Sequence, residues 1–139
     1  MSRDITKAHP LLQEFVPKAQ TWYAAKYPGS SLVVTHVDRT QLEQLRLFLQ
    51  ARLPDDDLKK LSLPISSSPV TWKDGFVNKS KHNVIPSHAI DFGIKKEGKF
   101  DWSDEAAKTL ASCVMDTGYI GRIKWGGIFE DCWHFQIKD

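Results

Sequence analysis

The run "HAIDFGI" (88–94) restricts most strongly how this 139-residue chain can fold. It is a short, mainly apolar run, which predicts a β-strand. Asp91 interrupts the apolar run, and an ionised carboxylate in an apolar strand is costly unless it is paired or bound to a metal. Other parts of the chain must therefore supply partners for Asp91.

The first half of the chain predicts two helices and a strand. Apolar residues at helical spacing predict a helix over 8–27, with Pro10 in its first turn and Pro17 expected to kink or split it. The β-branched run "SLVVTHV" (31–37) predicts a strand. A second helix, over 41–53, is expected to begin after Thr40 as the N-cap. It carries a leucine stripe made of Leu42, Leu45, Leu49 and Leu53.

The second half predicts a long loop, a helix and two further strands. Segment 54–79 contains several prolines and a serine run, and we expect a surface loop there. A helix is expected over 104–117, opened by Ser103, ended by Gly118, and facing inward through Ala107, Leu110, Ala111, Val114 and Met115. The segments "IGRIKWGG" and "WHFQIK" predict short strands around a glycine-rich turn. Without a βαβ rhythm, the predicted class is α+β, as one domain over residues 1–139.

Composition excludes several classes of protein. A net charge of +2 and a pI near 8.5 are too weakly basic to indicate nucleic-acid binding. No stretch approaches the roughly 20 apolar residues of a membrane span. The segment "MSRDITKAHPLLQEF" lacks the apolar region of a signal peptide. Cys113 and Cys132 are expected to be free thiols, since neither belongs to a C-x-x-C pair.

Two histidines and one aspartate form a candidate zinc site. Catalytic zinc usually has three protein ligands and an open position, and His82, Asp91 and His134 supply such a set. Asp131 precedes His134 by three residues, close enough to lie beside the metal as a general acid/base. The spacing of these residues alone does not decide whether they bind a metal.

Alternatives exist for each role. His88 is a rival ligand to His82, although strand parity puts it on the face opposite Asp91. Glu130 is the rival general base to Asp131. Cys132 as a fourth ligand would close the open position. His9 and His36 are assigned to structural or surface positions, and Trp72 of the long loop is a candidate lining residue of a substrate groove.

Three segments together resemble the D-alanyl-D-alanine carboxypeptidase and phage L-alanyl-D-glutamate peptidase family of zinc peptidases. "SKHNVIPSHAID" looks like its S-x-H…A-x-D motif, and "KWGGIFEDCWHFQI" resembles its W-G-G turn followed by D-x-x-H-F. "VDRTQLEQ" is similar to its R-[ST]-x-x-x-Q segment. The three matches occur in family order over residues 33–137. Trp133 stands where the family often has proline, and Ile128-Phe129 replaces the usual Asp-Trp, which bears on substrate preference.

The resemblance implies a role for each matching residue. His82, Asp91 and His134 are the expected Zn²⁺ ligands, and Asp131 is the expected catalytic acid/base. Arg39 matches the arginine that polarises the scissile carbonyl and stabilises the oxyanion. The resemblance implies that Ser80 contacts either the substrate or one of the zinc-ligating residues. It also implies a small antiparallel sheet that carries the zinc site, with helices on one side, as in hedgehog- and DD-peptidase-like folds.

The expected function is hydrolysis of peptidoglycan stem peptides at the L-Ala–D-Glu bond by a phage or prophage endolysin. Such an enzyme would be monomeric, would wait in the host cytoplasm before lysis, and would reach the wall through a separate holin. It would bind no nucleic acid and would not insert stably into a membrane. The alternatives are a D-Ala-D-Ala carboxypeptidase and a catalytically silent, zinc-stabilised wall-binding or structural module.

Overall fold

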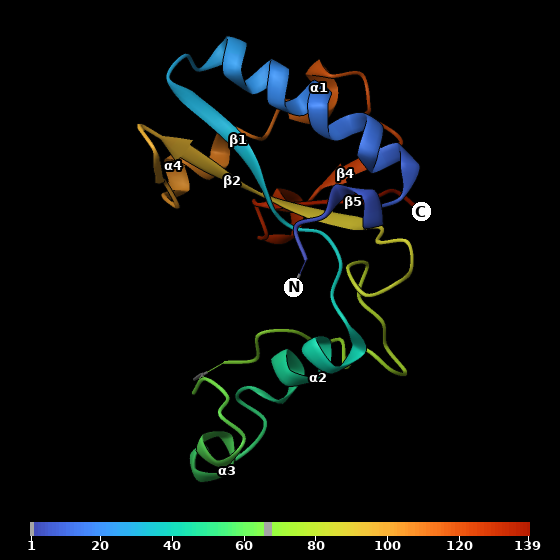
Figure 1. Ribbon diagram of the computed structural model, residues 1–139, viewed down its shortest axis with the longest axis vertical. Helices are drawn as coiled ribbons and strands as arrows, with labels where there is room; N and C mark the ends of the chain where they lie inside the picture. The colour runs from blue at the N-terminus through green and yellow to red at the C-terminus, as the bar shows by residue number, and fades with distance from the viewer. Residues whose placement is uncertain (1, 66–67) are drawn as a thin grey trace.

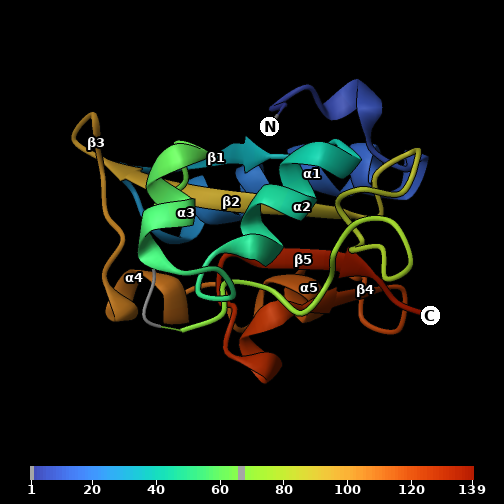
Figure 2. The ribbon, with the colours of Figure 1, turned by 90° about the horizontal axis from the view of Figure 1, so that it is seen from below.

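The strands form one antiparallel sheet in the computed structural model, which describes residues 2–65 and 68–139. The order across the sheet is β1-β2-β5-β4 (Figure 1). The short strand β3 pairs with β2 (Figure 2). The strands are β1 (Ser30–His36), β2 (Ala89–Lys96), β3 (Lys99–Phe100), β4 (Ile123–Trp125) and β5 (His134–Ile137).

One long helix, α1 (Pro10–Lys26), covers one face of this sheet (Figure 1). Pro10 occupies its first turn, as expected. The ring of Phe15 is fully buried and contacts the rings of Phe92, Tyr119 and Phe135. The expected split at Pro17 is wrong, since α1 is continuous. Pro17 is exposed, where water can satisfy the carbonyl that a proline leaves without an N–H donor.

Strand parity separates the core from the site. Ile90 and Phe92 are fully buried on the face of β2 beneath α1. Successive side chains of a strand point to opposite faces, so Asp91 projects from the other face. Phe135 of β5 packs in the same core, which puts its neighbour His134 on the face of Asp91. The face of the sheet that carries Asp91 and His134 is therefore the one turned away from α1.

Residues 40–65 and 68–79 form a lobe on that other side, connected to the sheet at both ends (Figures 1 and 2). The lobe holds α2 (Gln41–Leu49) and α3 (Asp55–Lys60), and α3 lies in a segment expected to be a loop. Thr40 caps α2 through a capping box with Glu43, as its sequence predicts. The helix ends at Leu49, short of the expected residue 53, and the leucine stripe is not buried: Leu42 is 62% exposed, and Leu45, Leu49 and Leu53 are half-buried.

The expected helix over 104–117 is two short helices, α4 (Asp104–Lys108) and α5 (Cys113–Asp116). Ser103 caps α4 as predicted. The helix breaks near Thr109, whose hydroxyl donates to the Ala106 carbonyl, a local bond that competes with the helical ladder. Of the inward-facing residues predicted, only Ala107 and Leu110 are buried; Ala111 and Met115 are exposed, and Val114 is half-buried.

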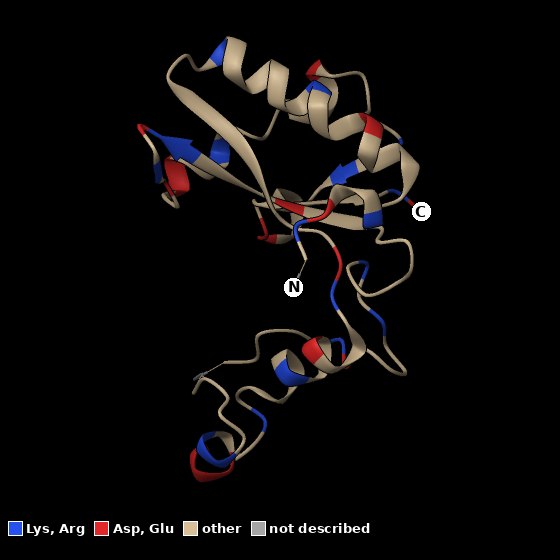
Figure 3. Ribbon diagram, in the orientation of Figure 1, with Lys and Arg blue, Asp and Glu red and all other residues tan. Residues whose placement is uncertain are grey.

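The described residues also include two short 3-10 helices: η1 (Ile5–Lys7) and η2 (Gly126–Phe129). The α+β class, with a small antiparallel sheet whose core face is covered by helices, is confirmed. Cys113 and Cys132 are free thiols. Lysine and arginine are interspersed with acidic residues over the sheet and the lobe (Figure 3). Within residues 2–65 and 68–139, no helix is long and apolar enough to cross a membrane.

Candidate metal centre and active site

Strand pairing places three polar residues in a row across the sheet. Asp91 of β2 lies directly opposite His134 of β5 on one side and His36 of β1 on the other. Opposed residues in an antiparallel pair share a face, so the three side chains project together from the face away from α1. His82 reaches the same point from the loop that precedes β2.

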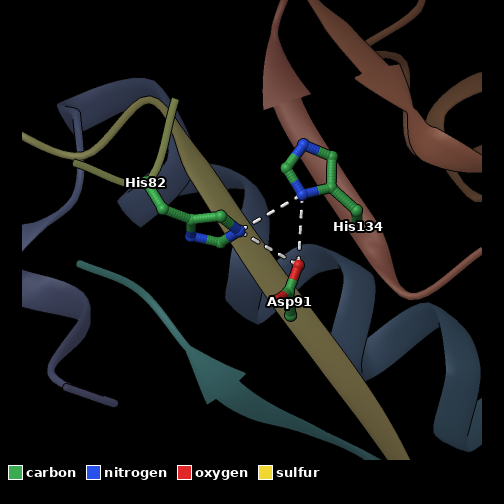
Figure 4. A group of neighbouring side chains, drawn as sticks. All are labelled: His82, Asp91 and His134. Carbon is green, nitrogen blue, oxygen red and sulfur yellow. Dashed lines mark hydrogen bonds and ion pairs between the residues drawn. The ribbon is translucent and has the colours of Figure 1, made fainter. Parts of the chain in front are cut away.

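The side chains of His82, Asp91 and His134 meet at one point (Figure 4). His82 Nε2 lies 3.2 Å from Asp91 Oδ1 and 3.2 Å from His134 Nδ1. His134 Nδ1 lies 3.2 Å from the same Asp91 oxygen. The three atoms form a nearly equilateral triangle. All three residues are largely withdrawn from solvent, with side chains 5%, 19% and 9% exposed respectively.

The outer nitrogen of each imidazole is held by a carbonyl group. His82 Nδ1 donates to the Val37 carbonyl at 2.8 Å, and His134 Nε2 donates to Gln136 Oε1 at 2.9 Å. These bonds fix the tautomer of each neutral ring so that the inner nitrogen presents a lone pair. Two lone pairs and a carboxylate oxygen then converge. Such a set attracts a cation to the space between its members.

The triangle fits zinc. A tetrahedral zinc ion with bonds of about 2.0–2.1 Å sets its ligand atoms about 3.3–3.4 Å apart, close to the three separations of 3.2 Å. Nitrogen and carboxylate ligands suit zinc, and the backbone carbonyl that holds His82 is a usual partner of a metal-ligating histidine. Among the residues that the structure describes, these three are the group that could hold a metal ion.

Charge in the triangle favours an ionised Asp91. Burial alone would raise the pKa of Asp91, but in the metal-free site hydrogen bonds from His134, His36 and His82 outweigh burial and hold the pKa of that carboxyl well below its usual range. Burial opposes charge on His134, but the bond to Asp91 outweighs it and raises the pKa of the imidazole. Asp91 is therefore an anion at neutral pH, as a zinc ligand must be.

A pocket of about 570 Å³ opens above the triangle, between the sheet and the lobe. Its lining includes all three triangle residues together with Asp131 and Arg39. Asp131 Oδ2 lies 3.9 Å from His134 Nδ1, and its side chain remains 55% exposed. Partial desolvation within the pocket raises the pKa of Asp131. An accessible carboxylate with a raised pKa, beside the triangle and outside it, suits proton transfer.

The rival residues lie elsewhere. Glu130 is exposed and is not among the lining residues of the pocket. The ring of His88 stands edge-on to that of His9 at 5.4 Å, outside the triangle. Cys132 is half-buried, and its carbonyl accepts from Trp125. Ser80 lines the pocket, and its hydroxyl accepts from the His82 amide at 3.2 Å.

Arg39 is held at the pocket by a buried glutamine. Its guanidinium donates to the side-chain oxygen of Gln44, which is fully buried. Gln44 Nε2 donates in turn to the Thr71 hydroxyl at 3.2 Å and the Lys73 carbonyl at 2.8 Å. Burial lowers the pKa of Arg39, but Asp91, Glu43 and Asp131 oppose this, and arginine stays charged at neutral pH.

Gln44 has no role in the sequence-based assignment, although its position was visible as the final glutamine of the R-[ST]-x-x-x-Q segment. Through its bonds to Thr71 and Lys73, Gln44 connects Arg39 to the segment of the lobe that carries Trp72. Trp72 lines the pocket at the solvent edge, 75% exposed, with Arg52 over its ring at 5.2 Å. The lobe therefore forms one wall of the pocket, and the sheet forms the other.

Gly126 is required by close packing around Asp131 and His134. A Cβ atom at this position would lie 2.3 Å from the Asp131 carbonyl oxygen and 2.9 Å from His134 Cβ. We expect Gly126→Ala to destabilise the metal-free protein by about 1–3 kcal/mol, as overpacking does, and to weaken zinc binding. Urea unfolding and zinc titration measure both effects. Ile128→Ala, at a side chain 70% exposed, is the matched control. Wild-type values for Gly126→Ala would show that the backbone over 126–131 adjusts freely.

Comparison with known proteins gives similarity at the level of the fold. No family model and no curated protein matches the sequence. Among solved structures, the L-Ala D-Glu endopeptidase ChiX of Serratia marcescens is similar, with a TM-score of 0.58 and 19% identity. The match covers 96% of this chain and 83% of that one. The chain thus shares the fold of this endopeptidase.

Proposed function

We propose that this protein is a zinc-dependent peptidase that hydrolyses the L-Ala–D-Glu bond of peptidoglycan stem peptides. The observation that carries the proposal is the triangle of His82, Asp91 and His134 on the floor of a pocket that also holds Asp131 and Arg39. The fold it shares with an L-Ala D-Glu endopeptidase supports this choice of bond. Its role as an endolysin of a phage or prophage, with a holin as partner, rests on the sequence resemblance.

Each group has a distinct task in amide hydrolysis. His82, Asp91 and His134 would hold zinc, which when bound supplies Lewis-acid polarisation and makes water more acidic. Asp131 would accept a proton from the attacking water and deliver it to the departing amine. Arg39 would donate hydrogen bonds to the carbonyl oxygen as negative charge develops on it. Gln44 would keep the guanidinium in place for this step.

Digestion of purified peptidoglycan tests the proposal directly. Fragments are analysed by mass spectrometry after the new amino groups have been labelled. New D-Glu amino termini on intact glycan strands are the expected result. Release of free D-Ala without new D-Glu termini would instead identify a carboxypeptidase. Absence of any cleavage by the zinc-loaded protein would favour a binding module.

Arg39 tests the charge-stabilising part of the mechanism. Arg39→Ala should lower kcat by about 10²–10³-fold, the typical cost of removing one oxyanion donor, with a smaller change in KM. Arg39→Lys should restore little, because an ammonium lacks the fork of donors. Arg46→Ala, at an exposed position of α2, is the control. Steady-state kinetics on a soluble stem peptide separates the two constants. A change in KM alone would assign Arg39 to holding a substrate carboxylate.

A further inference from the structure

A β-bulge in β1 brings His36 to the candidate metal centre. The pairing of β1 with β2 runs regularly as far as Val34 opposite Phe92, but the next pair is His36 opposite Asp91. Thr35 is therefore the extra residue. In a regular register Thr35 would stand opposite Asp91 and share its face, and His36 would not. Bulges beside active sites commonly re-aim a side chain in this way.

The displaced threonine helps to hold the bulge. Thr35 is 4% exposed, and its hydroxyl donates to the Asp91 carbonyl oxygen at 3.2 Å. The same hydroxyl lies 3.3 Å from His36 Nδ1. The backbone of Asp91 and the ring of His36 are thus both tied to one buried side chain.

The two oxygens of the Asp91 carboxylate have separate neighbours. Oδ1 faces His82 and His134 at 3.2 Å each. Oδ2 faces His36 Nδ1 at 3.4 Å, within ion-pair distance. Rotation of the carboxylate would exchange these oxygens, and a donor on Oδ2 opposes that rotation. His36 is not among the lining residues of the pocket, and its side chain is 44% exposed.

We propose that His36 is a positioning residue that orients the Asp91 carboxylate, with Oδ1 toward His82 and His134, and thereby raises the affinity of the site for zinc. The inference rests on the metal centre of the proposed function, and it concerns how tightly the metal is held rather than which bond is cut. Partners that orient a ligating carboxylate typically contribute 10–100-fold in metal affinity. Because His36 lies outside the pocket lining, KM at saturating zinc should not change.

Zinc titration of purified variants tests the role of His36. Competition with a chromophoric chelator gives Kd for wild type, His36→Ala, His36→Asn and His88→Ala, and circular dichroism of the metal-free proteins verifies folding. We expect His36→Ala to weaken zinc binding by about 10–100-fold. His36→Asn, whose amide nitrogen can replace Nδ1 as donor, should recover part of this loss. His88→Ala should match wild type. The d–d absorption bands of bound Co²⁺ should change in His36→Ala and largely return in His36→Asn.

Each contrary outcome has a definite meaning. Wild-type Kd values in both His36 variants would overturn the proposal, and so would absence of zinc binding by the wild-type protein. A second equivalent of zinc that His36→Ala loses would make His36 a ligand instead. If His36→Ala does not fold, His36→Asn and His36→Gln are compared instead, by Kd and by the Co²⁺ spectrum. The proposal requires the two variants to differ, because glutamine places its amide beyond the Nδ1 position. Zinc binding that depends on His36, without peptidoglycan cleavage, would overturn the proposed function and leave this role intact.

Discussion

His82→Ala is expected to abolish both stoichiometric zinc binding and peptidoglycan hydrolysis. The mutation removes one corner of the triangle and leaves two ligands, too few for a stable zinc site in a protein. The wild-type protein should retain one equivalent of zinc per chain after dialysis, and His82→Ala should retain almost none. Elemental analysis measures the zinc, and release of soluble wall fragments measures the activity.

Zinc should also stabilise the folded protein, since the triangle exists only when β2, β5 and the loop before β2 are assembled. A ligand present at 100 times its Kd contributes about 2.7 kcal/mol to the free energy of unfolding. Chelation should therefore lower Tm in the wild type and have little effect in His82→Ala. His88→Ala is the matched control, because it removes a histidine six residues away that lies outside the triangle. Zinc retained in His82→Ala but lost in His88→Ala would show that the ligand has been misassigned.

Asp131→Ala should give the opposite combination, with zinc retained and turnover lost. Its carboxylate lies beside His134 and outside the triangle, so its removal takes away a proton carrier and no ligand. General acid–base groups contribute about 10²–10⁴-fold, and we expect kcat to fall within that range. Zinc content, kcat and KM are measured on the same preparation.

Glu130→Ala is the control for Asp131, because it removes the adjacent carboxylate, which is exposed and lies outside the pocket lining. Wild-type kinetics are expected for this variant. An inactive Glu130→Ala with an active Asp131→Ala would move the general base by one residue. Loss of zinc from Asp131→Ala would make Asp131 a ligand and would contradict the division of roles proposed above.

Sequence patterns predict the elements that pack into the core better than those outside it. The helix over 8–27 and the strands at 31–37 and 88–94 are found close to their expected bounds, because burial against a second layer enforces their periodicity. The leucine stripe expected over 41–53 has the same periodicity but lies outside the main core, where Leu42 is largely exposed and the other three leucines are half-buried. A helical pattern indicates which face could be buried, and tertiary structure decides whether it is.

The candidate site also depends on tertiary structure that the sequence pattern does not show. The motif spacing identified His82, Asp91 and His134 as candidates, but their convergence depends on the register that puts Asp91 opposite His134. That register is a property of two strands more than 40 positions apart in the sequence. The contact of His36 with Asp91 depends on a bulge of one residue, and nothing in "SLVVTHV" marks where the pairing shifts.

The segments that enter and leave the lobe are hydrogen-bonded to each other where they join the sheet. The Arg39 amide donates to the His82 carbonyl at 2.9 Å, and the carbonyl of Val37 accepts from both His82 Nδ1 and the Ser87 hydroxyl. The intervening residues thus form a loop whose ends are already joined at the metal centre. Closing such a loop costs only about 0.6 kcal/mol more for each doubling of its length. Insertions and deletions between α2 and Trp72 can therefore reshape the lobe wall of the pocket across evolution while the register of the sheet and the candidate zinc ligands stay unchanged.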